Sequence, residues 1–446
     1  MKGFIVAAGA AAMTSDSNYK HTASGIVPKV LKQHAGEAST LWRRRQGVCI
    51  SRHNRFVDLV HYDRRLDDNL YALTIVGQSS YSALDAEIAI DQRDGLFAAF
   101  SCALRMNDKI RLLALLERYA DAEYYAHALT GALSWHLELP LAKHLCDTNF
   151  WAQVKRPIDR LILLAAVADI RADPGRLLDL ALLENDSAIR QRAYRAIGEY
   201  GLRQHVQPLR DAMANEQGLA RHYASCAAYA LSEDRRADPA FDILAHALCE
   251  DSEAGWQAAK VLMTLADLPD ADRVVCWLSK KAPLHPLLVI ATGLTGNPRY
   301  AEWLLEVMKR PSSARLAFAA FSLITDIDAT AYEDQTRRIA AGEGQAAPAK
   351  SWIADYFEDW PLPDIERVSS WWQTNKDRFV SDQRYVLGKA RSFDALAGAL
   401  LNESQAVREI IAAHLRGAMP LLPLAPVFAP ASAQMKYLHI DPTFIG

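Results

Sequence analysis

Apolar residues recur at helical spacing along almost the whole chain. Between Ile26 and Leu41 they fall at steps of three and four residues, and the same period returns between Arg55 and Leu73. Runs of alternating apolar and polar residues, which would indicate half-buried strands, are nearly absent. The pattern therefore predicts an all-α protein.

One two-helix unit stands out before the middle of the chain. Asp186 or Ser187 can cap the helix SAIRQRAYRAIGEY, because their side-chain oxygens accept hydrogen bonds from first-turn amides. Gly201 is expected to end that helix, since glycine adopts a left-handed conformation at little cost. Asp173-Pro174 is expected to begin the partner helix, where the missing amide of proline does no harm.

Helix starts of this kind recur at a regular spacing. They lie at Asp173-Pro174, Asp238-Pro239 and Asn297-Pro298, with weaker ones at Gln207-Pro208 and near Asp270. The centres of the second helices lie at Ala196, Ala227, Val261, Ala291 and Ala320, which are 31, 34, 30 and 29 residues apart. A fixed period in this range predicts a solenoid, and small central residues allow neighbouring helices to pack closely. We expect a HEAT-like α-solenoid of stacked antiparallel helix pairs with helical segments capping both ends.

Changes in composition and in the hydrophobic pattern divide the chain into five parts. Residues 1–25 are predicted to be a flexible leader, 26–94 an N-terminal helical segment, 95–330 the repeat array, 331–418 a C-terminal helical cap rich in aromatics, and 419–446 a proline-punctuated tail. The prolines of the tail favour an extended path.

Composition narrows the possible settings. Fifty basic and 53 acidic residues give a net charge of −3, without the basic excess of a dedicated nucleic-acid-binding protein. No apolar run approaches the ~18 residues that span a bilayer. The cysteines are dispersed and are expected on apolar helix faces as reduced thiols, which favours a cytoplasmic protein: Cys49, Cys102, Cys146, Cys226, Cys249 and Cys276. The alternative is export, because GFIVAAGAAA after Met1-Lys2 is similar to a short signal peptide.

Two stretches carry a family resemblance. HAGEASTLWRRR with FVDLVHYDRRLDDNLYAL near the front, and PLPDIERVSSWWQTNKDRFVSDQRYVLGKA with VREIIAAHL near the end, resemble an uncharacterised proteobacterial family of HEAT-like proteins often encoded among type VI secretion genes. The matched positions are Trp42, Arg43, Arg44, Leu59, Asp63, Arg64, Leu66, Leu70, Leu73, Gly77, Pro363, Trp371, Trp372, Phe379, Arg384, Gly388 and Arg408.

The resemblance spans Ile26 to Leu415 and implies the repeat architecture and a secretion-associated setting. It implies no catalytic residues, because the family has no established activity. The chain departs from the family pattern where Glu-Arg-Leu and His-Leu-Asp are usual, with Arg65, Asn69 and Tyr71 at the corresponding places. That departure puts in doubt any shared task of those polar positions.

The most basic part of the chain follows Trp42. It contains Arg43, Arg44, Arg45, Arg52, Arg55, Arg64 and Arg65. These guanidinium groups could dock an acidic surface or a phosphate backbone through bidentate contacts. Alternatively they lie over helix surfaces and pair with nearby acids such as Glu37 and Asp63.

An aromatic group marks the C-terminal cap. Trp352, Trp360, Trp371 and Trp372 could form a binding hot spot for a partner protein, since tryptophan is enriched at such sites. They could equally cover the exposed apolar end of the repeat stack.

The sequence gives only weak evidence for a catalytic or metal-binding group of residues. His136, Glu138, His144 and Cys146 lie close in sequence, but their spacing matches no zinc site and the P-C-x-x-C half of a deaminase signature is missing. Phosphate-binding, dinucleotide-binding and nucleophile-elbow motifs are absent. We therefore predict no enzyme activity, no cofactor and no metal.

The sequence favours a protein–protein interaction scaffold or adaptor, with a secretion effector or apparatus component as partner. One alternative is a DNA-binding protein or an alkylpurine DNA glycosylase, because some HEAT-like proteins hold a duplex in a basic groove. A second is pigment-lyase activity, which rests on fold analogy alone.

Overall fold

The computed structural model describes residues 27–119, 123–281, 285–334, 351–420 and 422–440. It confirms an all-α, solenoid-like fold of packed helix pairs. The predicted leader, with its signal-like stretch, lies outside the described residues.

The described chain forms two compact units. Unit 1 contains residues 27–50, 57–193 and 426–440, and unit 2 contains residues 51–56 and 194–425. The helices of the first unit are α1 Pro28–Val48, α2 Phe56–Ile75, α3 Tyr81–Ile90, α4 Gln92–Arg105, α5 Lys109–Tyr119, α6 Glu123–Trp135, α7 Pro140–Leu145, α8 Thr148–Gln153, α9 Pro157–Asp169, α10 Leu177–Leu182 and α25 Ala431–Leu438. Helix α11 Ser187–Tyr200 spans the boundary between the two units.

Unit 2 continues the array and adds the C-terminal helices. Its elements are α12 Val206–Asn215, α13 Gly218–Leu231, α14 Ala240–Ala247, α15 Glu253–Leu265, α16 Leu268–Lys281, α17 Pro286–Thr295, α18 Ala301–Met308, α19 Ala314–Thr325, α21 Trp352–Tyr356, α22 Ile365–Asn375, β1 Tyr385–Val386, β2 Lys389–Ala390, α23 Phe393–Asn402 and α24 Gln405–Ala418.

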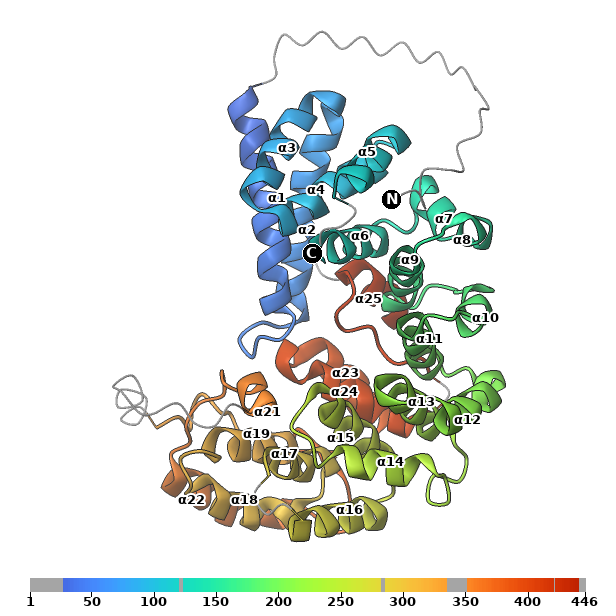
Figure 1. The fold of residues 1–446 in the computed structure, drawn as a ribbon. Helices are drawn as coiled ribbons and strands as arrows, with labels where there is room; N and C mark the ends of the chain where they lie inside the picture. Colours follow the sequence, from blue (N-terminus) through green and yellow to red (C-terminus); the bar gives the residue numbers. More distant parts are fainter. Residues whose placement is uncertain (1–26, 120–122, 282–284, 335–350, 421, 441–446) are drawn as a thin grey trace. The chain divides into compact units, whose positions relative to one another are not determined.

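The repeat period predicts the layers of unit 2 correctly. One layer is a stack of the helices α13, α15, α17 and α19 (Figure 1). A second layer, made of α12, α14, α16 and α18, packs against this stack. Small residues allow the close stacking: a Cβ on Gly293 of α17 would lie 2.6 Å from the Cα of Ala320 in α19. Four of the five predicted centres are buried, whereas Val261 is only half-buried, because α15 turns Ala258 and Leu262 inward instead.

Local signals fix several helix ends. The Asp186 carboxylate accepts a hydrogen bond from the amide of Ala188 at 2.9 Å, and Gly201 ends α11 with a φ of 80°. The expected start at Asp173-Pro174 is early by three residues: Asp173 instead closes a turn by accepting from the Gly175 amide, and α10 begins at Leu177.

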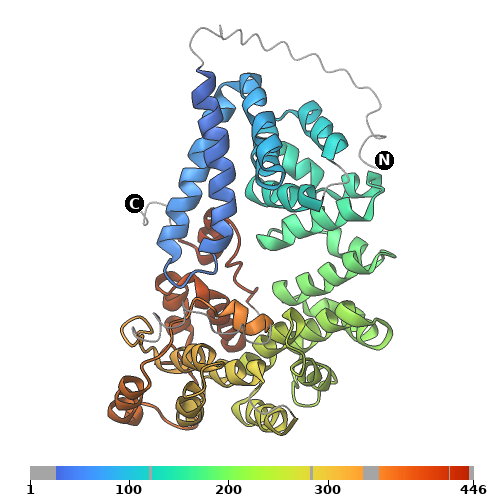
Figure 2. The same cartoon turned by 60° about the vertical axis from the view of Figure 1, so that its left-hand side comes forward.

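Unit 1 begins with the two longest helices. Helices α1 and α2 lie side by side (Figures 1 and 2), and the His34 ring of α1 bonds the Asn69 side chain of α2 over 2.8 Å. Helix α1 also packs on α3 and α4, α4 packs on α6, and α6 packs on α9. A continuous core therefore runs through these helices.

The C-terminal part of unit 2 runs along the carboxyl ends of the stacked helices. Leu387 and Gly388, both with positive φ, form the two-residue turn between β1 and β2. The Tyr385 amide donates to the Gly296 carbonyl at 2.7 Å, and the Leu387 amide donates to the Leu323 carbonyl at 2.7 Å. This segment therefore closes helix ends whose carbonyls have no intrahelical partner.

Three expectations from sequence need correction or comment. The tail is not extended throughout, because residues after Pro430 form α25, whose proline start suits a helix. Cys249 and Cys276 are exposed rather than on apolar faces, although none of the six cysteines forms a disulfide. Within the described part of the chain, no helix is both long and apolar enough to cross a membrane.

Candidate binding site

The predicted basic cluster is divided between different environments. Arg43, Arg44, Arg64 and Arg65 are exposed on α1 and α2 of unit 1, whereas residues 52 and 55 belong to unit 2. Arg43 pairs with Asp91 at 2.6 Å, and Arg65 lies 3.9 Å from the Glu37 carboxylate. Pairing with nearby acids, one of the two interpretations from sequence, thus describes Arg43 and Arg65.

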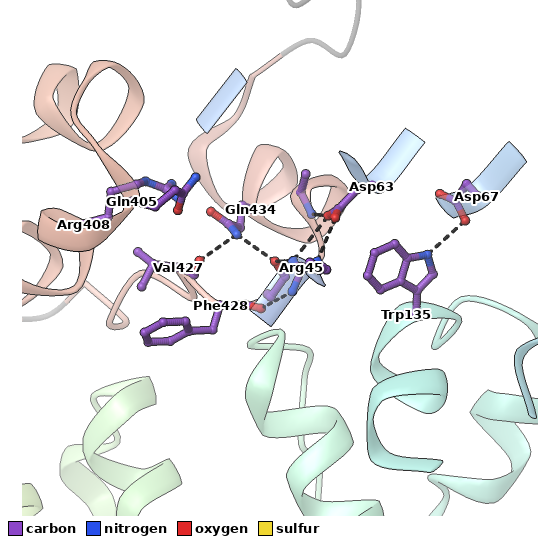
Figure 3. A network of polar contacts seen from close by, with 11 residues as sticks. Arg45, Asp63, Asp67, Trp135, Gln405, Arg408, Val427, Phe428 and Gln434 are labelled. Atoms are coloured by element: carbon purple, nitrogen blue, oxygen red, sulfur yellow. Dashed lines mark hydrogen bonds and ion pairs between the residues drawn. The ribbon is translucent and has the colours of Figure 1, made fainter. Parts of the chain in front are cut away.

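Arg45 is buried and joins three segments of unit 1 (Figure 3). Its Nε donates to Asp63 Oδ1 at 2.7 Å, and its two terminal nitrogens donate to the carbonyls of Phe428 and Ala429. Asp63 Oδ2 accepts the amide of Ala431 at 2.7 Å and so caps α25. Burial disfavours the guanidinium charge, but electrostatic attraction to Cys49 and Asp63 and the hydrogen bond to Asp63 outweigh it and raise the Arg45 pKa.

Trp42 is also a core residue. Its ring stacks on Phe97 with centroids 3.7 Å apart, and Trp135 meets both rings edge-on. The Arg45 guanidinium lies 5.2 Å from the Trp135 ring centroid. Trp42 and Arg45 are therefore mostly buried and hold unit 1 together.

The C-terminal tryptophans pack mainly against unit 2. Trp360 and Trp372 are buried, and Trp372 meets Phe321 of α19 edge-on at 5.8 Å between centroids. Trp371 meets the same ring at 6.2 Å, and the half-buried Trp352 stacks on Tyr356. These contacts describe a cover over the last repeat helices, with Trp352 and Trp371 partly accessible.

The His136–Cys146 segment is not assembled around a common point. Burial lowers the pKa of His136 to about 3, so its ring is neutral. Glu138 is exposed and pairs with Lys143 and Lys436, while the His144 ring lies against Phe150. Among the described residues, no group of three or more His, Cys, Asp and Glu side chains has a metal-binding arrangement.

Three arginines of the C-terminal segment attach it to the repeat helices. Arg384 Nη1 donates to the carbonyls of Met263 and Thr295 at 2.5 and 2.9 Å, and Nη2 donates to that of Ala266. Arg391 donates to the Thr264 carbonyl at 2.9 Å, and Arg416 Nη2 donates to the Gly198 carbonyl in the last turn of α11 at 3.4 Å. These acceptors lie at or beside helix carboxyl ends, where the helix dipole favours a cation.

A cavity of about 120 Å³ lies where α24 crosses α11, α13 and α15 (the α24 cavity). Apolar and weakly polar side chains form most of its wall: Tyr223, Cys226, Val261, Thr264, Ala413 and Leu424. Val261, Ala413 and Leu424 are half-buried, so the cavity opens to the surface there. Packing of α24 on α15 supplies two of its walls.

One end of the α24 cavity holds a buried ion pair. The Lys260 ammonium, 4% exposed, bonds the Glu409 carboxylate and lies 5.1 Å from the Trp256 ring centroid. Burial lowers the Lys260 pKa, and Glu409 opposes this shift. The Tyr356 hydroxyl donates to the other Glu409 oxygen at 3.3 Å. Glu409 thus already has partners for both oxygens.

The Cys226 thiol of the wall and the adjacent His222 are neutral at physiological pH. Burial raises the pKa of Cys226 to about 12 and lowers that of the adjacent His222 to about 4. A thiolate is the reactive form of cysteine, so Cys226 is a poor nucleophile here. At the rim, Arg195 pairs with Glu199 at 2.8 Å. The arrangement suits non-covalent binding of an apolar group.

The size of the α24 cavity limits its occupant. Cavities of roughly 150 Å³ in protein cores accept one benzene ring, whereas whole small-molecule sites usually measure 300–1,000 Å³. An opening of about 120 Å³ therefore fits a single branched or aromatic side chain. The sequence did not identify this site, because Lys260 and Glu409 are 149 positions apart.

Comparison with protein-family models, with curated proteins and with solved structures found no match to this chain.

Proposed function

We propose that this protein is a non-catalytic scaffold that binds another protein by holding one apolar side chain of it in the α24 cavity. The observation that carries the proposal is an accessible, mostly apolar opening of about 120 Å³ on the repeat array. Interface hot spots are side chains that fill such desolvated pockets near the centre of a contact.

The surroundings of the α24 cavity support a peptide-like occupant. The stacked helices already accommodate an amphipathic helix of the chain itself, since α24 packs along α15. Helix-in-groove recognition uses the same kind of surface. The Arg195–Glu199 pair at the rim offers both charges to a partner backbone or side chain without a strong preference for polyanions.

A random peptide library displayed on phage tests this proposal. Peptides selected on the wild-type protein should share one aromatic or branched apolar residue. Ala413→Phe places a ring in the opening and should weaken binding of those peptides at least tenfold. Ala214→Phe, the same change at an exposed site on α12, is the matched control and should bind as the wild type does.

Two results would contradict this proposal: peptides without a common apolar residue, or equal binding by the Ala413 and Ala214 variants. Circular dichroism on both variants separates loss of binding from loss of folding.

The identity of the partner rests on the sequence resemblance alone, and the location rests on the dispersed cysteines. We propose a cytoplasmic location and a partner among type VI secretion effectors or apparatus components. Deleting the gene and measuring effector release tests this part independently of the α24 cavity.

The nucleic-acid alternative receives less support. Arg384, Arg391 and Arg416 lie against the repeat helices, but they donate to main-chain carbonyls and are not positioned for phosphates. A salt-dependent mobility shift with duplex DNA would revive that alternative.

A further inference from the structure

Helix α2 presents a straight stripe of exposed residues opposite its buried face. The stripe is Val57, His61, Arg64, Asp68, Tyr71 and Ile75, which follow one another at steps of four and three residues. The opposite face is buried and includes Leu59, Asp63, Leu66, Leu70 and Leu73. Steps of this kind keep residues on one side of a helix over several turns.

Large apolar side chains lie at both ends of this α2 stripe. Val57 is 40% exposed, Tyr71 62% and Ile75 63%. Isolated exposed apolar residues need no explanation. Three on one stripe, with a cation and an anion between them, form a surface that a partner with the matching pattern can cover.

The α2 stripe is complementary to itself when reversed. In two antiparallel copies whose two-fold axis crosses the stripe at the level of Leu66, Val57 faces Ile75 of the other copy, and His61 faces Tyr71. Arg64 faces Asp68 on both sides of the axis. Apolar side chains thus meet at the two ends, two aromatic rings meet next to them, and opposite charges meet at the centre, as a two-fold symmetric interface requires.

We propose that the α2 stripe is a homodimer interface in which α2 packs antiparallel on α2 of a second copy. A parallel alignment would place each charged residue against its own kind and is unfavourable. A helix runs 1.5 Å per residue, so the stripe is about 27 Å long. A contact of one helix pair lies at the small end of specific interfaces, and we expect a weak dimer with a Kd on the order of 10 µM.

Charge exchange on the full chain tests this interface by sedimentation velocity. The wild type should change from monomer to dimer as its concentration rises through about 10 µM. Arg64→Asp places Asp against Asp68, and Asp68→Arg places Arg against Arg64. Each variant alone should weaken dimerisation at least tenfold.

Two further samples restore the complementary charges. An equal mixture of the Arg64→Asp and Asp68→Arg proteins pairs unlike charges again and should recover the wild-type Kd as a heterodimer. The double variant Arg64→Asp/Asp68→Arg should recover it as a homodimer, and it retains the net charge of the wild type. Lys32→Asp on α1 changes the charge by the same amount and should leave dimerisation unchanged.

A wild type that stays monomeric up to about 0.5 mM overturns the proposal, since that is far above the expected Kd. So does a dimer that the single variants leave intact, or one that the mixture fails to restore. Because the samples are compared without any peptide or partner, these outcomes are independent of the α24 cavity.

Discussion

Arg45 of unit 1 and Arg384 of unit 2 are both buried, and both attach a late segment of the chain to earlier helices. Their charges are compensated differently. Arg45 has a buried carboxylate, Asp63, as its partner. Arg384 instead donates to carbonyls at the ends of α15 and α17, where two helix dipoles contribute roughly half a negative charge each.

The difference appears in the proton affinities of the two groups. The pKa of Arg45 is raised, because Cys49 and Asp63 together outweigh the burial that opposes it. Burial and the nearby Arg391 lower the pKa of Arg384 to about 10. A buried guanidinium can thus be accommodated at helix carboxyl ends, but a buried carboxylate partner stabilises its charged form more strongly. Unit 1 should depend more strongly on its arginine than unit 2 does.

Replacing Arg45 should have the largest effect. Arg45→Met leaves the Asp63 carboxylate buried without its cation, which costs about 3–5 kcal/mol in comparable cases. Urea denaturation followed by circular dichroism measures the loss. Arg43→Met, a matched change at an exposed arginine of the same helix, should cost less than about 1 kcal/mol. Equal losses would show that Arg45 is not the critical residue of its segment.

Replacing Arg384 should cost less. Arg384→Met leaves neutral carbonyls unpaired and removes a buried charge as well, so we expect a loss of about 1–3 kcal/mol. The same urea titration provides the value. A loss greater than that for Arg45→Met would contradict the comparison between the two arginines.

Acid should destabilise both units through buried histidines. Burial lowers the pKa of His136 in unit 1 to about 3 and of His222 in unit 2 to about 4. An unfolded histidine binds a proton below about pH 6.5 while the folded ring does not, so stability falls as pH falls from 6.5 toward those values.

Between pH 7 and pH 5 each of these histidines should lower the free energy of unfolding by about 2 kcal/mol. His136→Phe and His222→Phe should each remove that share of the pH dependence. Urea titrations at the two pH values measure the difference, and variants whose pH dependence matches the wild type would refute the assignment. The pH range over which stability falls should extend to lower pH for His136 than for His222.

The smallest effect should come from filling a close helix contact. In Gly293→Ala the added methyl meets the main chain of Ala320, which cannot move aside as a side chain can. Overpacking costs about 1–3 kcal/mol, offset by the roughly 1 kcal/mol by which alanine favours a helix over glycine. We expect a net loss of about 1 kcal/mol. Gly398→Ala on α23, where the added methyl has no neighbour within 4 Å, should instead stabilise.

The helices and their repeat period could be predicted because both depend on local spacing. The same spacing also carried information about Arg45. Leu31, Ala35, Ala38, Trp42, Arg45 and Cys49 follow one another at steps of four and three residues, and all are buried. Counting along that stripe predicts that Arg45 is buried and that Arg43 and Arg44 are not. The basic composition alone had placed all three in one cluster.

The α24 cavity and the Arg384 contacts left no such signal. Main-chain carbonyls accept hydrogen bonds whatever residue carries them, so the sequence does not mark the partners of Arg384. The Lys260–Glu409 pair forms only when α24 packs on α15, a contact between distant segments. The placement of α25 likewise depends on Asp63, far earlier in the chain.

The central claim is that a partner side chain enters the α24 cavity. Methyl-labelled protein titrated with a library-selected peptide and followed by NMR tests it most directly. The account predicts shifts at the methyl groups of Val261, Ala413 and Leu424, and none at Ala35 or Ala38 in the core of unit 1. Shifts that spare the first three and appear elsewhere would contradict it.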